Sequence, residues 1–404
     1  MIKALFYKLL EKRHFWRYAS FSEIAELYAS RTVRVIAMNI VSGFTSVYLY
    51  EEGYSLTFIM AFWFCYYLFK MPISFLSVFF VSRFGPKHGI LLSNLLYAPS
   101  MVALGSMTAT GTLGIVLWGI FMAVSASLYH LSYMVDFSKV KNVEHAGKEI
   151  AFMNILEKVA VGLSPIIGGL IALWFGLQVV IWAAAFLFIF SALPLFKTIE
   201  PVRIKQKVVF RGFPWRMTAR SLFAHTGVGF DYVTTVMAWS LFVVIVVFPG
   251  AGWDIYVKLG FLSSVTILAA ITASYTYGKL IDRSRGGDLL KLSVVANAVV
   301  HLFRPFAVTP SAIVGTNITN EIATMGYNMA FMRGVFDTAD LSGHRILYLC
   351  LCNIVSEIGA IIACAILVAC SWFMGDVDGL KIFFVFAAGF VLLTGTANFR
   401  LYRR

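Results

Sequence analysis

Three charged residues interrupt long apolar runs of the sequence: Lys70, Asp231 and Glu321. A charge at the centre of a membrane costs about 2.5–3.5 kcal/mol on insertion scales, so each one needs a physical reason. Binding a charged solute is one reason. Carrying a proton is another, because a buried carboxyl without a partner takes up a proton near neutral pH. The alternative is a structural ion pair or a hydrogen-bonded polar cluster.

Polar and aromatic side chains in other apolar runs extend this candidate site. Hydrogen-bonding groups among aromatic rings suit an organic solute, although tyrosine and tryptophan also pack at membrane interfaces. A histidine would add a proton carrier, because its unperturbed pKa is about 6.5, or it is a structural residue near a helix end. The candidate residues for binding a substrate or a proton are Asp231, Glu321, Lys70, Asn39, His130, Asn317, Tyr66 and Trp239.

Three further ionisable residues lie away from the middle of their apolar runs. Glu157 and Glu357 are expected to form salt bridges with arginines of the polar turns and loops. Arg304 is expected to reach outward to lipid headgroups.

The elements that must position these residues are membrane-spanning helices. The 404 residues are 60% hydrophobic and 13% charged, whereas soluble domains carry about a quarter charged residues. Several runs reach the roughly 20 residues that span hydrocarbon. Breaks in hydropathy predict twelve spans, and the alternating segments of about 10 residues typical of a β-barrel are absent.

Lysine and arginine gather in alternate turns and predict the orientation. If both termini are cytoplasmic, most of the 33 basic residues lie inside. The opposite turns are acidic: they hold Glu51, Glu52, Asp254, Asp376 and Asp378. We therefore expect a multi-pass protein of the plasma membrane, or of the inner membrane in a Gram-negative cell. The net charge of +13 reflects this bias and an affinity for anionic lipids, so it requires no nucleic acid.

Short echoes at an offset of about 200 residues divide the chain into two halves. The turn "VFFVSRFGPKHG" at 78–89 corresponds to "GKLIDRSRGGDLL" at 278–290. Likewise "YHLSYM" at 129–134 corresponds to "YNMAFM" at 327–332, and "NILEKVA" from Asn154 to "NIVSEIGA" from Asn353. Echoes in the same order predict two six-helix repeats.

The two echoing turns carry a motif. Gly278, Asp282 and Arg283 form Gly-x-x-x-Asp-Arg, and the earlier turn keeps Arg83 but has Ser82 in place of the aspartate. Such a glycine lets two helices pack closely, and such an aspartate can accept a hydrogen bond from a helix N-terminus. Together with six plus six spans and a basic middle loop, these turns resemble those of the major facilitator superfamily.

The resemblance implies an all-α membrane protein with twelve transmembrane helices in two six-helix halves. The expected divisions are a cytoplasmic amphipathic segment at 1–31, an N-terminal bundle at 32–197, a basic cytoplasmic linker at 198–217 and a C-terminal bundle at 218–404. The resemblance also implies a conformational latch, formed by Gly278, Asp282, Arg283, Arg83 and Gly85.

The implied function is secondary active transport of a small organic solute by alternating access, with proton coupling left open. A lipid or lysolipid flippase is one alternative, and a receptor or scaffold on a degenerate carrier fold is another. A cavity lined by charge and open to one leaflet would favour the flippase, and a cavity filled by Phe and Leu would favour the scaffold.

We expect neither an enzyme nor a cofactor or metal site. The sequence has no Gly-x-x-x-x-Gly-Lys-Ser/Thr loop and no His-Glu-x-x-His. The five cysteines lie in apolar runs and are interpreted as buried packing residues. The expected partners are the solute and membrane lipids, and the protein is expected to be a monomer.

Overall fold

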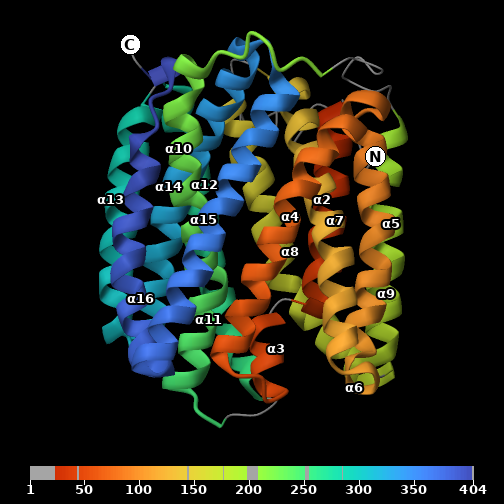
Figure 1. The fold of residues 1–404 in the computed structure, drawn as a ribbon, viewed down its shortest axis with the longest axis vertical. Coiled ribbons are helices and arrows are strands. Elements are labelled where there is room, and N and C mark those ends of the chain that lie inside the picture. The colour runs from red at the N-terminus through yellow and green to blue at the C-terminus, as the bar shows by residue number, and fades with distance from the viewer. Residues whose placement is uncertain are drawn as a thin grey trace, which may run out of the picture.

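The computed structural model describes residues 23–42, 45–142, 145–175, 177–197, 208–250, 254–283 and 285–402. These residues form helices joined by short turns (Figure 1). The amphipathic segment expected at 1–31 lies outside the described residues as far as residue 22. The first part of the expected linker, 198–207, also lies outside them.

Two sets of helices form what we name the N half and the C half. The N half contains α2 (Glu23–Ser42), α3 (Thr45–Glu51), α4 (Leu56–Phe84), α5 (Pro86–Gly105), α6 (Met107–Thr110), α7 (Thr112–Val140), α8 (Ala146–Phe175), α9 (Leu177–Ser191) and η2 (Leu193–Lys197). The C half contains α10 (Trp215–Tyr232), η3 (Val233–Ala238), α11 (Trp239–Phe242), η4 (Val243–Val247), α12 (Asp254–Asp282), α13 (Gly286–Phe303), η5 (Arg304–Phe306), α14 (Pro310–Ser342), α15 (Arg345–Met374), α16 (Asp376–Val391), η6 (Leu392–Thr396) and η7 (Arg400–Tyr402).

The expected all-α architecture of two six-helix halves is confirmed. The short elements continue longer helices, as in the rod from Trp215 to Val247 that joins α10 to η4. Within the described residues, eight helices are long and apolar enough to cross a membrane. The first long helix begins at Glu23, earlier than the bundle boundary expected at residue 32.

Local sequence signals set several helix ends. Ser55 caps α4 by accepting a hydrogen bond from the Phe58 N–H. Thr309 caps α14 in the same way, with Pro310 in the first turn. Gly85 separates α4 from α5 with a φ of 94°, a conformation that side chains with a Cβ rarely adopt. These caps explain why long antiparallel helices follow one another with few intervening residues.

Two seams join the halves. Along one seam α4 packs against α15, and along the other α8 packs against α12. Figure 1 shows α4 and α15 side by side between the two halves. Residues at the middle of these helices therefore face a boundary between independent bundles.

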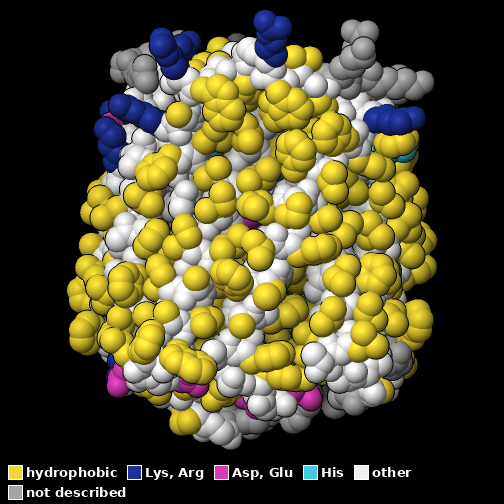
Figure 2. Space-filling view, in the orientation of Figure 1, with side chains coloured by type: hydrophobic (Ala, Val, Ile, Leu, Met, Phe, Trp, Pro, Cys, Tyr) yellow, Lys and Arg dark blue, Asp and Glu magenta, His cyan; other side chains and the backbone are white. Residues whose placement is uncertain are grey.

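The surface divides into three zones along the helices. Figure 2 shows a broad apolar belt, with lysines and arginines gathered at one end and acidic side chains at the other. We name these ends the basic face and the acidic face. Both described ends of the chain lie at the basic face (Figure 1). An apolar belt between two charged ends is the surface expected of a protein that spans a membrane.

The expectation that every cysteine is buried was wrong for one of them. Cys350, Cys352, Cys364 and Cys370 are buried, and Cys65 is exposed. Cys65 lies on α4, a helix with an apolar outer side on which Leu68 and Phe69 are also exposed. An apolar run therefore did not distinguish the lipid-facing side of a helix from its packed side.

Two glycines allow α10 and α15 to cross with their backbones in contact. A Cβ on Gly229 would lie 1.7 Å from the Ser356 carbonyl oxygen, and a Cβ on Gly359 would lie 2.0 Å from the Thr226 carbonyl oxygen. Backbone atoms cannot rotate away as side chains do. Any larger residue at either position must therefore push the two helices apart.

Replacing one of these glycines should destabilise the C half. We expect Gly359→Ala to lower the melting temperature, because overpacking typically costs about 1–3 kcal/mol. Gly389→Ala is the matched control, because no heavy atom lies within 4 Å of its added Cβ. Tryptophan-fluorescence melting of both purified variants in detergent measures the difference. Equal melting temperatures would contradict the close crossing.

Candidate functional site

Two ion pairs join the halves near the middle of the helices. Lys70 Nζ on α4 lies 3.1 Å from Glu357 Oε1 on α15. Lys158 Nζ on α8 lies 2.6 Å from Glu321 Oε1 on α14. Each pair places a charge from one bundle against a charge from the other. The structure thus places the predicted residues Lys70 and Glu321 at the boundary between the halves.

The Lys70–Glu357 pair belongs to a larger polar group. Ser74 Oγ donates to Glu357 Oε1 at 2.7 Å, and Asn353 Nδ2 donates to the same oxygen at 3.0 Å. The Glu357 side chain is 2% exposed and that of Lys70 is 12% exposed. Several donors around one buried carboxylate offset part of its desolvation.

The salt bridge of Glu157 with an arginine is confirmed, but this arginine lies within α2 rather than in a turn or loop, and the partner expected for Glu357 was wrong. Arg31 Nε lies 2.6 Å from Glu157 Oε1. Glu357 pairs with Lys70 rather than with an arginine of a turn or loop. The reason is depth: Glu357 lies in the middle of its helix, where a turn arginine cannot reach it and a lysine of the facing helix can.

Exposed side chains from both halves lie beside these pairs. His130 on α7 is exposed and within electrostatic range of Lys70 and Arg31. Tyr232 on α10 is 53% exposed and lies within the same range of Tyr66. Tyr66 itself is buried against Trp63 in an edge-to-face contact. His130 and Tyr232 thus have accessible surface beside the charged boundary.

Asp231 is enclosed within the C half. His301 Nε2 lies 2.6 Å from Asp231 Oδ1, Asn297 donates to the same oxygen at 3.0 Å, and Tyr327 donates to Oδ2. Asp231 is 2% exposed and His301 is fully buried. Asp231 and Glu321, which were predicted to share a cavity, therefore have separate partners: Asp231 bonds within its own bundle and Glu321 bonds to the other.

The N half buries a cation in the corresponding place. Arg34 is 2% exposed and donates to Asn94 Oδ1. Its guanidinium carbon lies 3.7 Å from the centre of the Tyr129 ring. Asn94 and Tyr129 lie on α5 and α7, the helices of the N half that correspond to α13 and α14, which carry Asn297 and Tyr327. The two halves thus share a polar site with opposite charge.

The expectation that Arg304 reaches outward was wrong. Arg304 is fully buried, and it donates to the Asn320 Oδ1 at 2.8 Å and to the Thr234 carbonyl oxygen at 3.3 Å. Its guanidinium also stacks 4.9 Å from the centre of the Trp239 ring. These internal acceptors, together with the nearby Asp231 charge, hold the arginine inside the bundle.

The remaining predicted binding residues form local contacts. Trp239 Nε1 on α11 donates to Asn317 Oδ1 on α14 at 2.7 Å, so the structure brings these two together. Asn39 Nδ2 donates to the Val35 carbonyl oxygen at 2.8 Å, within its own helix. The predicted residues therefore occupy several neighbouring polar sites rather than one.

The motif of the later turn forms a contact between the halves at the basic face. Asp282 Oδ1 accepts a hydrogen bond from the Gly147 N–H at 2.9 Å, in the first turn of α8. A Cβ on Gly278 would lie 3.0 Å from the Gly147 carbonyl oxygen. Both contacts predicted for the motif are thus confirmed. Arg283 and Arg83 are exposed, and Gly85 is buried at the end of α4.

Sequence reasoning missed other contacts that close the basic face. Lys141 Nζ lies 2.8 Å from Asp340 Oδ2, and Arg345 donates to Ser138 Oγ at 3.1 Å. Phe137 packs on Phe336 with ring centres 5.2 Å apart. The available signal was their position, because α7 and α14 end at equivalent points of the two repeats.

A buried carboxyl lies beside this closed face. Burial raises the pKa of Glu149 to about 7, although the Asn142 N–H donates to its Oε2 at 2.8 Å and lowers it. An ordinary glutamate has a pKa of about 4.3. Glu149 therefore exchanges a proton near neutral pH.

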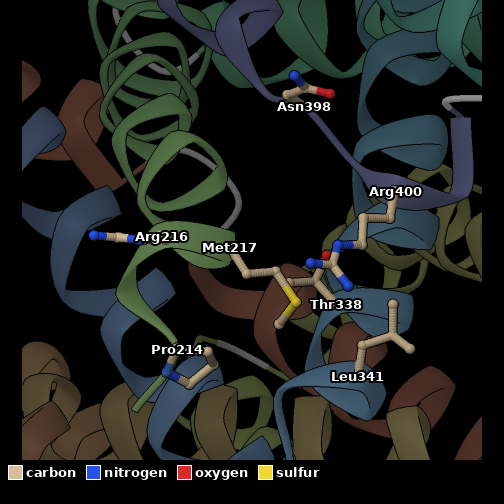
Figure 3. A pocket seen from close by; sticks show the side chains of 7 residues that line it. All are labelled: Pro214, Arg216, Met217, Thr338, Leu341, Asn398 and Arg400. Carbon is tan, nitrogen blue, oxygen red and sulfur yellow. The ribbon is translucent and has the colours of Figure 1, made fainter. Parts of the chain in front are cut away.

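A separate pocket of about 320 Å³ opens at the basic face of the C half (Figure 3). Its walls come from the start of α10, the end of α14 and the C-terminal residues. The lining residues are Pro214, Arg216, Met217, Thr338, Leu341, Asn398 and Arg400. None of the mid-depth ion pairs contributes to this pocket.

One protein-family model matches most of the chain. The family model described as "Major Facilitator Superfamily" matches residues 27–364. The chain belongs to the major facilitator superfamily. Members of this superfamily are membrane transporters rather than enzymes, and the resemblance inferred from the two turns is confirmed.

Solved structures of the superfamily share the whole fold. The human organic anion transporter MFSD10 (TETRAN) is 11% identical with a TM-score of 0.70, covering 92% of this chain and 97% of that one. A bacterial homologue of the iron transporter ferroportin, in an outward-facing state, is 11% identical with a TM-score of 0.69, covering 93% and 98%. The E. coli fucose:proton symporter FucP is 12% identical with a TM-score of 0.67, covering 93% and 98%. No curated protein matches the sequence.

Removing the Asp231 carboxylate should destabilise this superfamily member strongly. We expect Asp231→Ala to cost about 3–5 kcal/mol, because it leaves buried donors and the nearby Arg304 charge without their acid. Asp378→Ala is the control, because Asp378 is 69% exposed in its pair with Lys381 and such pairs contribute about 0–1 kcal/mol. Thermal unfolding in detergent compares the two. A melting temperature for Asp231→Ala equal to that of the control would contradict the structural importance of the cluster.

Proposed function

We propose that the protein is a secondary active transporter that moves a small organic solute by alternating access of its two halves. The observation that best supports this proposal is two ion pairs between the halves at the middle of the membrane, Lys70–Glu357 and Lys158–Glu321. Charges at this depth are costly and mark solute or ion pathways. In this fold, rocking of one half against the other alternately opens a site at their boundary.

The closed basic face defines one end of this cycle. The Asp282–Gly147 hydrogen bond and the Lys141–Asp340 ion pair both join the halves there. Opening toward this face requires both to break, while the α4–α15 and α8–α12 seams remain as pivots. Asp282 and Gly278 thus act as the latch of the closed state.

The charged boundary favours a transporter over a scaffold. A scaffold has no need for ions in the middle of the membrane, and a centre filled by Phe and Leu would serve it better. Here Lys158 and Glu321 meet at the boundary with their side chains 30% and 13% exposed. Such partly accessible charges suit a site that exchanges its partners during transport.

Breaking the latch should shift the conformational balance. We expect Asp282→Ala to lengthen distances across the basic face, because it leaves the Gly147 N–H without its acceptor. Spin labels at Phe84→Cys and Leu341→Cys, both exposed, report this distance in a chain in which exposed Cys65 is replaced by Ser. Asp288→Ala, in the same turn, is the control. An unchanged distance distribution in Asp282→Ala would remove the latch role.

The orientation is tested by labelling intact cells. We propose that the basic face is cytoplasmic, because lysine and arginine gather there (Figure 2). An impermeant thiol reagent should label Asp378→Cys from outside, and should label Arg211→Cys only after the membrane is opened. Both sites are exposed, so access to the reagent depends on the side of the membrane. Labelling of Arg211→Cys in sealed cells would reverse the orientation.

A further inference from the structure

Three ion pairs described between the halves have the same polarity. In Lys70–Glu357, Lys158–Glu321 and Lys141–Asp340, the base belongs to the N half and the acid belongs to the C half. The Asp282–Gly147 hydrogen bond follows the same rule, with its acid on the C half. At these contacts the N half is thus positive and the C half negative.

This polarity sets what happens when the halves separate. Lys158 on α8 would be left as an unpaired cation on the N half, and Glu321 on α14 as an unpaired anion on the C half, whereas Lys70–Glu357 lies on the α4–α15 seam that remains as a pivot. Each charge loses its partner at a depth where water is scarce, so separation is opposed unless something replaces the partners. A ligand shifts a conformational equilibrium only through such a difference in interaction.

A ligand with one kind of charge replaces only one side. A carboxylate pairs with Lys158 but leaves Glu321 bare, and an amine does the reverse. A solute with both an anionic and a cationic group satisfies both sides at once. Arg31 adds a further cation on the N half, although Glu157 accepts two hydrogen bonds from it.

We infer that the transported solute is a small zwitterion of the amino-acid type. Its carboxylate binds Lys158 of the N half, and its ammonium binds Glu321 of the C half. This inference rests on the proposed transport function and names its substrate class.

Matched probes test the charge requirement directly. Purified wild-type protein is screened by thermal shift against the twenty common amino acids. For each one that stabilises it, three derivatives follow: the methyl ester, which is a cation; the N-acetyl acid, which is an anion; and the N-acetyl amide, which is neutral. We expect stabilisation by at least one free amino acid and its loss with all three derivatives. Stabilisation by none of the twenty, or equal stabilisation by a derivative, would overturn the inference.

An exchange of charges separates binding from structural pairing. The double variant Lys158→Glu, Glu321→Lys keeps an ion pair at the α8–α14 contact but reverses its polarity. We expect it to fold and to bind the stabilising amino acid about tenfold more weakly or worse, a difference of about one unit in log Kd. The conservative variant Lys158→Arg keeps the polarity and should bind nearly as wild type. Wild-type affinity in the exchanged variant would contradict the assignment.

The outcomes distinguish this inference from the proposed function. The spin-label distances across the basic face are measured without any solute. If Asp282→Ala opens that face but no amino acid stabilises the protein, alternating access stands and the zwitterion is rejected. If the spin-label distances are unchanged in Asp282→Ala while a zwitterion binds, alternating access with this latch is rejected and the zwitterion assignment stands.

Discussion

An ion inside a membrane must have a partner, and the arrangement of the two halves satisfies this constraint. Lys70 and Lys158 would each be costly alone, and they are paired with acids that lie 287 and 163 positions further along the sequence. Removing one member of such a buried pair costs about 3–5 kcal/mol. The halves are therefore held together by mutual charge compensation as well as by apolar packing along α4 and α15.

Inside each bundle the same constraint is met in a different way. The N half surrounds Arg34 with an amide and an aromatic ring, whereas the C half surrounds Asp231 with donors from α13 and α14. Small residues also change sides in the repeat. Gly89 of α5 faces Ser132 of α7, but Ser293 of α13 faces Gly326 of α14. In each half a glycine thus packs against a serine, with the glycine on α5 in the N half and on α14 in the C half.

The sequence predicted the features that depend on local composition or on the repeat. Hydropathy revealed the helices, and the turn motif led to the Asp282–Gly147 hydrogen bond because its geometry is set within one turn and the facing helix start. The sequence did not reveal the partner of Glu357, because α4 and α15 belong to different halves and meet only after both halves have folded. Arg304 was misplaced for a related reason: its position near a helix end suggested a surface, whereas its acceptors come from η3 and α14.

The shared polarity of the two mid-depth ion pairs also bears on biosynthesis. The N half leaves the ribosome first and exposes Lys70 and Lys158 on the surface that will meet the C half. A second copy of the N half would bring lysine against lysine, so two nascent chains cannot satisfy each other through this surface. Only a C half supplies the complementary acids, and the one attached to the same chain is present at the highest local concentration. The charge layout thereby guards newly made protein against pairing between identical halves.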